Sequence, residues 1–180
     1  MVRQISKPKP GEFAPYTTMY IDLLPDDGQV LTHLQNNLKL MIELIQAFPE
    51  EKLIQPFAPN EWTIKEIFVH VIDDERIYAY RALRFARGDT TKLPGFEQDD
   101  YVPYSQANQR TVPSIIDELT AVRAATVSLF NSFGDEDLLR KGTGSGNVLS
   151  VRAAAYHIAG HELHHLDSIK SNYGHWAMQS

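Results

Sequence analysis

Residues 150–173 read SVRAAAYHIAGHELHHLDSIKSNY, and this stretch decides what kind of fold the chain can adopt. Ser150 is a preferred residue at the start of a helix, and Gly174 stands where helices commonly end. The apolar residues between them recur at helical spacing and define one buried face: Val151, Ala155, Ile158, Leu166 and Ile169. The stretch therefore predicts a long helix that packs against other helices along this face.

Three further segments repeat the same spacing of apolar residues, at about 27–48, 63–87 and 113–133. Thr63 and Glu66 fit a capping box, in which the hydroxyl and the carboxylate each satisfy an amide at the start of a helix. The sequence shows no credible strand and no internal repeat. It therefore predicts an all-α protein that folds as a four-helix bundle.

The segments outside these helices predict the rest of the organisation. Residues 1–25 contain four prolines, which predict an extended arm, and its aromatic residues suggest that the arm packs on the bundle. Residues 26–180 form a single domain in this interpretation, with a long loop at 88–111 between the second and third helices. Between the last two helices, the run Gly142-Thr-Gly-Ser-Gly146 favours a flexible linker over an anion-binding loop, because it follows no strand and lacks the lysine of a P-loop.

The composition narrows the chemistry that is open to the chain. It has 180 residues, seven histidines, no cysteine and a net charge of −6. Without cysteine, a disulfide scaffold and a cysteine nucleophile are excluded, and any metal must be bound through nitrogen and oxygen. The acidic balance argues against a nucleic-acid partner. The polar N-terminus and the absence of a long apolar run predict a cytoplasmic protein without a membrane partner.

Four of the histidines lie within nine residues of the last predicted helix. His161 and His165 are one turn apart, a spacing that lets two imidazoles reach one ion. On a helical wheel His165 falls inside the apolar face and His161 falls at its edge, so we expect both to point inward. His157 and His164 lie further round, and we expect them beside the site or at the surface.

The second predicted helix offers a third ligand. His70, Asp74 and Arg81 lie along the edge of its apolar face, a conflict with pure packing that is typical of functional sites. If the second and last helices are neighbours, His70 joins the pair on the last helix. Three histidines with an open fourth position are the pattern of a catalytic zinc site, although Ni²⁺ and Fe²⁺ also suit imidazole.

Two carboxylates in these helices need a partner. Glu162 falls in the middle of the apolar face of the last helix, so we expect Arg81 or another cation to pair with it. Asp74 is a candidate base, or a group that orients an imidazole, and Asp73 competes with it for that role. A simple buried ion pair between Asp74 and Arg81 is the alternative.

Residues 161–165 also satisfy the zinc-protease pattern H-E-x-x-H, with Glu162 in the place of the general base. The rest of the sequence argues against a protease. The longer form of the motif needs glycine and histidine where the chain has Ser168 and Ser171, and no acidic residue follows Asp167 to serve as a distant ligand.

Several short motifs together resemble the DinB-like family, which includes YfiT-like metal-dependent hydrolases. They are Glu61–Glu66 (EWTIKE), His70–Arg76 (HVIDDER), Tyr80–Arg84 (YRALR), Arg87–Asp89 (RGD), Leu93–Phe96 (LPGF) and Ala159–His165 (AGHELHH). The resemblance implies a four-helix bundle, often dimeric, with a divalent metal bound by His70, His161 and His165. Related branches transfer low-molecular-weight thiols, and in this chain such a thiol must arrive as a cosubstrate because there is no cysteine.

The sequence thus predicts an enzyme that uses Zn²⁺ or Ni²⁺, with Fe²⁺ and Mn²⁺ also suitable. The ion would activate water or a cosubstrate thiol to act on a small molecule, as in a hydrolase or a thiol S-transferase. The alternative is a dimeric bundle that binds a metal or a small molecule without catalysis.

Overall fold

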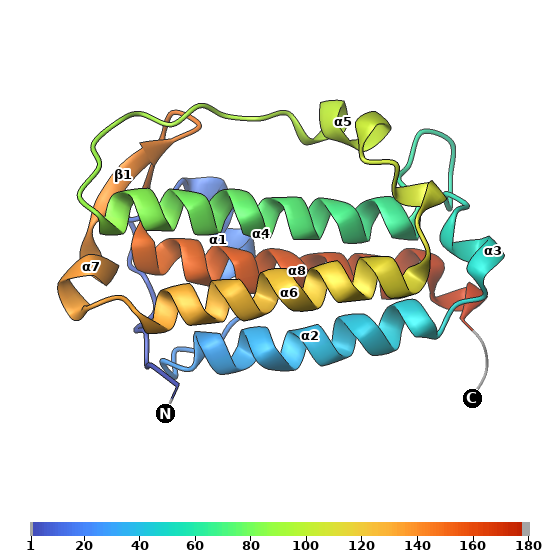
Figure 1. The fold of residues 1–180 in the computed structure, drawn as a ribbon, viewed down its shortest axis with the longest axis horizontal. Coiled ribbons are helices and arrows are strands. Elements are labelled where there is room, and N and C mark those ends of the chain that lie inside the picture. Colours follow the sequence, from blue (N-terminus) through green and yellow to red (C-terminus); the bar gives the residue numbers. More distant parts are fainter. Residues whose placement is uncertain (1, 178–180) are drawn as a thin grey trace.

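The computed structural model describes residues 2–177 and confirms the predicted all-α four-helix bundle (Figure 1). The long helices are α2 (Val30–Gln46), α4 (Ile64–Ala86), α6 (Val112–Asn131) and α8 (Val151–Tyr173). The shorter elements are η1 (Pro15–Thr17), α1 (Thr18–Ile21), α3 (Glu50–Leu53), α5 (Gln98–Tyr101), η2 (Val102–Tyr104), η3 (Ala107–Gln109), α7 (Asp135–Leu139), β1 (Lys141–Gly144), β2 (Asn147–Ser150) and η4 (Gly174–Trp176).

Side-chain caps begin three of the long helices. At α4 the hydroxyl of Thr63 accepts a hydrogen bond from the amide of Glu66, whose carboxylate accepts one from the amide of Thr63, so the predicted capping box is present. Ser150 caps α8 and Thr111 caps α6 in the same manner, each through its hydroxyl. These contacts satisfy amides that have no partner within the helix itself, and so fix where each helix begins.

The order of the helices in space explains the long loop. α2 and α8 run in one direction and α4 and α6 in the other (Figure 1), and α4 packs against both α6 and α8. Because α4 and α6 are parallel neighbours, the chain must return along the whole bundle before α6 begins. Residues 87–111, which include α5, make this crossing along the outside of α4 (Figure 1).

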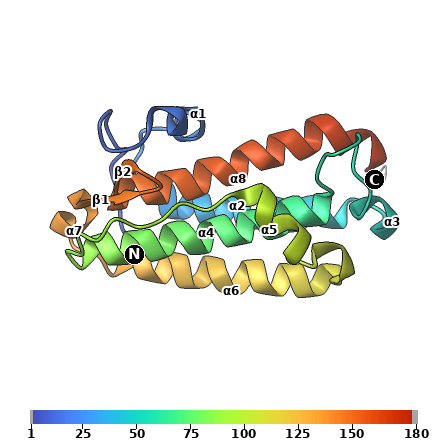
Figure 2. The same cartoon turned by 90° about the horizontal axis from the view of Figure 1, so that it is seen from above.

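The N-terminal arm departs in part from the extended chain that its prolines predict. Residues 15–21 form η1 and α1, with Pro15 at the first helical position, where no amide donor is needed. α1 lies against α8 on the side away from α6 (Figure 2). Ile5 and Ile21 of the arm are buried, and the hydroxyl of Tyr156 donates a hydrogen bond to the carbonyl of Ile5.

The glycine-rich run is not a flexible linker, and the absence of strands was also a wrong prediction. β1 and β2 pair as an antiparallel hairpin. Ser145 and Gly146 both have positive φ angles, as the tightest hairpin turns require. A Cβ on Gly142 would lie 2.1 Å from a ring carbon of Phe85, so the hairpin packs too closely on α4 for any larger residue there.

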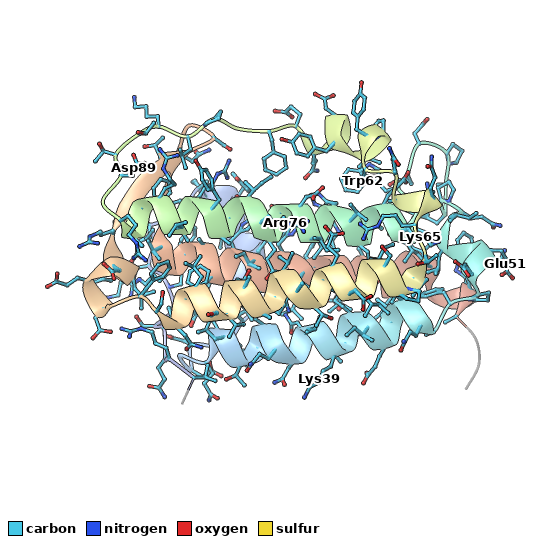
Figure 3. The ribbon with its side chains drawn as sticks, viewed as in Figure 1. Lys39, Glu51, Trp62, Lys65, Arg76 and Asp89 are labelled. Carbon is cyan, nitrogen blue, oxygen red and sulfur yellow. The ribbon has the colours of Figure 1, made fainter. Side chains whose placement is uncertain are left out.

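The core fills the space between the four long helices, while charged side chains such as Lys39 and Glu51 project outward (Figure 3). The first half of α8 is buried almost all round, because α1, α2 and α4 all pack against it. Within residues 2–177, no helix combines the length and the hydropathy needed to cross a membrane.

Candidate metal centre

Three predicted ligands meet between α4 and α8. Nε2 of His70 on α4 lies 3.1 Å from Nε2 of His161 on α8, and Nε2 of His165 lies 3.1 Å from the same atom. The ligand atoms of all three lie within 4.8 Å of one another. α4 and α8 are direct neighbours, and this is the condition on which the inclusion of His70 depended.

Burial keeps these three imidazoles neutral. The loss of solvation lowers the pKa of His70, lowers that of His161 to about 3, and lowers that of His165 to about 2. Metal ions bind the neutral form of imidazole, so the site does not have to lose protons before binding near pH 7. The ring of Trp62 packs edge-on against His70, with ring centroids 4.9 Å apart.

Asp74, one turn after His70 on α4, lies on the other side of His161. Its Oδ2 is 3.3 Å from Nδ1 of His161 and accepts a hydrogen bond from Nε2 of His157 at 3.2 Å. Burial alone would raise the pKa of this carboxyl group, but His161 and His157 lower it well below its usual range. Asp74 therefore stays ionised, in the position of a carboxylate that orients a metal-binding imidazole.

His157 lies beside the cluster, one of the two positions expected for it, and is deeply buried. It is 2% exposed and stacks on Tyr78 at a centroid distance of 3.6 Å. The ring of Tyr20, from α1, lies edge-on to His157 and His161, at 5.3 Å from each. This cover depends on Gly160, where a Cβ would come within 2.1 Å of the carbonyl oxygen of Tyr20.

The other predicted site residues lie around this cluster or away from it. His164 is half-buried beside Tyr20, at a centroid distance of 5.4 Å. Asp73 is also half-buried, 3.9 Å from Arg76, and does not belong to the three-histidine cluster. Arg81 is buried, but no carboxylate of the described residues lies within 4 Å of it, so the alternative of an ion pair with Asp74 is wrong.

Glu162 has the cationic partner that its position demands, but that partner is not Arg81. Arg123 of α6 donates to Glu162 at 2.6 Å and also to Glu75 of α4. The Arg123 side chain is 2% exposed, and because it also donates to the carbonyl of Leu34 on α2, it joins all four long helices in the centre of the bundle. The sequence contained a signal for Arg123, because it follows Leu119 by one turn on the buried face of its helix.

A cavity of about 190 Å³ opens beside the cluster. Asp74, His157 and His161 line one part of it, and Arg81 lines another. The wall is completed by aromatic and polar residues that lie far apart in the sequence: Tyr16, Tyr20, Tyr78, Phe96, Gln98 and Ser145. The long loop thus contributes Phe96 and Gln98, the N-terminal arm contributes Tyr16 and Tyr20, and the hairpin contributes Ser145. A larger hollow of about 580 Å³ lies between α2 and α6, and no group of potential ligands lines it.

The donor set fits a divalent transition metal. In tetrahedral coordination, Zn–N bonds of about 2.0–2.1 Å place two ligand nitrogens about 3.3–3.4 Å apart. The observed separations of 3.1 Å are close to that value. Asp74, His157 and His161 form a second group whose ligand atoms lie within 4.8 Å of one another, but there the carboxylate already receives a hydrogen bond from His157. The three-histidine group is the better candidate.

Fold and site together define an all-α bundle with a three-histidine cluster between two of its helices, of the kind that binds a divalent metal. The chain belongs to the DinB superfamily, whose model matches residues 33–169. This confirms the family that the sequence motifs resemble. No curated protein matches the chain by sequence.

Two solved structures share the fold. YfiT from Bacillus subtilis, described as a probable metal-dependent hydrolase with an unusual four-helix bundle topology, has a TM-score of 0.73 and 12% identity, with 83% of this chain and 87% of that chain covered. The mycothiol-dependent maleylpyruvate isomerase has a TM-score of 0.65 and 10% identity, with 82% of this chain and 61% of that chain covered. At these identities the likeness shows the fold.

Proposed function

We propose that the protein is a divalent-metal-dependent enzyme that acts on a small molecule, with His70, His161 and His165 as the ligands. The observation that carries the proposal is the convergence of the three Nε2 atoms in neutral imidazoles. When bound to such a set, a divalent ion lowers the pKa of a water or thiol in its open position, so that a nucleophile exists near neutral pH.

The surrounding residues have distinct tasks in this proposal. Asp74 holds the ring of His161 so that Nε2 faces the other two histidines. Tyr78 packs on His157 and Tyr20 covers His157 and His161, so these two rings shield that side of the site from bulk water. The cavity volume of about 190 Å³ suits a small molecule and is too small for a folded peptide segment.

Two reaction types agree with the comparisons, namely hydrolysis and thiol transfer. One structural neighbour is described as a probable metal-dependent hydrolase, and the other depends on mycothiol. A thiol in this reaction belongs to a cosubstrate, because the chain has no cysteine. Zn²⁺ or Ni²⁺ suits three imidazoles best, with Fe²⁺ and Mn²⁺ as further possibilities. The proposal includes a homodimer in the cytoplasm, and sedimentation analysis tests the oligomeric state.

Metal analysis of protein purified without an affinity tag tests the proposal. We expect a stoichiometric divalent ion in the wild type and its loss in His161→Ala. His175→Ala is the matched control, because His175 is exposed and lies outside the cluster. Equal metal content in all three proteins would contradict the metal site.

A second assay separates an enzyme from a binding protein. Metal-loaded wild type is tested with esters, with amides and with pairs of a thiol and an electrophile. Turnover that disappears in His161→Ala supports the enzyme. Metal binding without turnover of any of these compounds would favour the non-catalytic bundle.

A further inference from the structure

Arg81 is a buried cation without an anionic partner. It is 4% exposed, and within residues 2–177 no carboxylate lies within 4 Å of its guanidinium. Among the described residues, the other two buried arginines, Arg123 and Arg152, both bind carboxylates. Burying a charge without a partner is costly, so an unpaired buried arginine that faces a cavity indicates a ligand that supplies the missing charge.

The crossing loop and the hairpin hold the guanidinium in place. Nη2 of Arg81 donates to the carbonyl of Pro94 at 3.1 Å and to Oγ of Ser145 at 2.8 Å. The two segments are also joined to each other, because the amide of Ser145 donates to the carbonyl of Leu93. A Cβ on Gly144 would lie 3.0 Å from Nε of Arg81, so the glycine lets the hairpin backbone lie against the side chain.

The role of the glycine-rich run is therefore to hold the side chain of Arg81 in position, and not to bind an anion through its own backbone amides. The two hydrogens of Nη2 are used by Pro94 and Ser145, which leaves three of the five N–H donors without an acceptor among the described residues. The guanidinium carbon lies over the ring of Tyr78, 5.0 Å from its centroid, within the range of a cation–π contact. A rigid guanidinium with free donors is the arrangement that recognises planar or tetrahedral oxyanions.

Arg81 and His161 both line the cavity of about 190 Å³, so the guanidinium and one of the three predicted metal ligands face the same space. The cavity volume is about the volume that six water molecules occupy in liquid water. One small molecule can thus reach both groups.

We propose that Arg81 binds an oxyanion group of the substrate, a carboxylate or a phosphate, and so orients the opposite end of the molecule toward the histidine cluster. The proposal rests on the proposed function for the identity of that reacting end, but the binding of the anion by Arg81 does not require the metal. The substrate class is a small organic anion.

The test uses the full-length protein and three probes with one aromatic ring each, chosen because aromatic side chains line the cavity. Benzoate and phenyl phosphate carry the two kinds of oxyanion, and benzamide is the neutral control. Dissociation constants are measured by NMR titration, first after treatment with a chelator and then after loading with Zn²⁺. The variants are Arg81→Met and Arg81→Lys, with Arg84→Met as the matched control because Arg84 pairs with Asp89 outside the cavity.

In metal-free wild type and in Arg84→Met we expect at least one of the two anions to bind about ten- to hundredfold more tightly than benzamide, the range for hydrogen bonds to a charged group. Arg81→Met should lose this preference and still bind benzamide as the wild type does, and Arg81→Lys should retain part of it. The anion that benefits more identifies the oxyanion.

Equal binding of all three probes by metal-free wild type would overturn the proposal, and this measurement needs no variant to fold. An unchanged preference in Arg81→Met would overturn it as well, since another group would then bind the anion. A preference that appears only after Zn²⁺ is added would assign the anion to the metal instead of Arg81. Failure of the metal site is read separately, from the metal content of the protein, and leaves the metal-free titration valid.

Discussion

Replacing Asp74 by asparagine removes the charge that faces His161 while preserving the shape of the side chain. Oδ2 of Asp74 lies 3.3 Å from Nδ1 of His161, and the carboxylate is 4% exposed, so water does not screen it. Loss of a group that orients a metal-binding imidazole costs about 10- to 100-fold in metal affinity, or about 1.4–2.7 kcal/mol. Because bound metal stabilises the folded state by mass action, the increase in Tm caused by saturating Zn²⁺ should be smaller by about 3–10 °C.

The assay is competition for Zn²⁺ against a chromophoric chelator at pH 7, together with thermal unfolding with and without Zn²⁺. Asp73→Asn is the matched control, because it makes the same chemical change one residue earlier, where the side chain is half-buried and 3.9 Å from Arg76. We expect the affinity of the control to equal that of the wild type. Equal affinities for Asp74→Asn and the wild type would refute the orienting role, and an equal loss in both variants would reduce it to a general effect of net charge.

Three further predictions concern stability. Gly160→Ala would gain about 1 kcal/mol in helix propensity, but its Cβ would lie 2.1 Å from the carbonyl oxygen of Tyr20, and overpacking costs about 1–3 kcal/mol. We therefore expect no rise in Tm and faster proteolysis of the N-terminal arm, and a clear rise in Tm would contradict this contact. For Glu12, burial raises the pKa but hydrogen bonds, above all from Arg152, lower it from 4.5 to about 2. A lowered pKa stabilises the folded protein above about pH 4.5, and this stabilisation is lost as the pH falls to about 2. The difference in unfolding free energy between wild type and Glu12→Gln, measured by urea unfolding, should therefore shrink from pH 4.5 to pH 2. A difference that does not depend on pH would contradict this. Arg123→Leu leaves two buried carboxylates without their cation and should lower the free energy of unfolding in urea by about 3–5 kcal/mol. A decrease below about 1 kcal/mol would show that the carboxylates have another partner.

The convergence of the three histidines could be predicted because it depends on regular geometry. The separation of His161 and His165 by one helical turn follows from the sequence, and so does the position of His70 at the edge of the apolar face of α4. Only one further condition was needed, that α4 and α8 are neighbours. The structure fulfils it.

The helical wheel did not indicate how deeply His157 lies, because it assumes that a helix has one buried face. α8 is covered by α4 on one side and by α1 on another, so His157, which lies outside the main apolar stripe, is nonetheless 2% exposed. The aromatic residues of the arm indicated that it packs on the bundle but not where, since a four-residue helix has no periodicity to interpret. Gly160 was the available sign, because glycine in the middle of a long helix is unfavourable unless another backbone approaches closely.

The partner of Glu162 shows a second limit of reasoning from one helix at a time. The requirement for a cation was correct, since a carboxylate on a buried face cannot remain alone. Which residue supplies this cation depends on how α6 is rotated about its axis. Arg123 follows Leu119 by one turn and so lies on the buried face of α6. The spacing of apolar residues does not predict a charged residue at such a position. Because Arg123 pairs with Glu162, Arg81 has no carboxylate partner among the described residues. Its guanidinium is therefore available to a ligand in the cavity.

The glycine-rich hairpin explains why composition alone was misleading at the wall of the cavity. A glycine that provides flexibility and a glycine that permits close approach are identical in the sequence, and only the neighbours distinguish them. Here a Cβ at Gly142 would meet Phe85 and one at Gly144 would meet Arg81, both on α4. The run is therefore a rigid contact surface, and its rigidity is what fixes the direction of the guanidinium. If the hairpin were flexible, Arg81 would turn toward solvent to be hydrated, and a buried cation without a carboxylate would not persist in the fold.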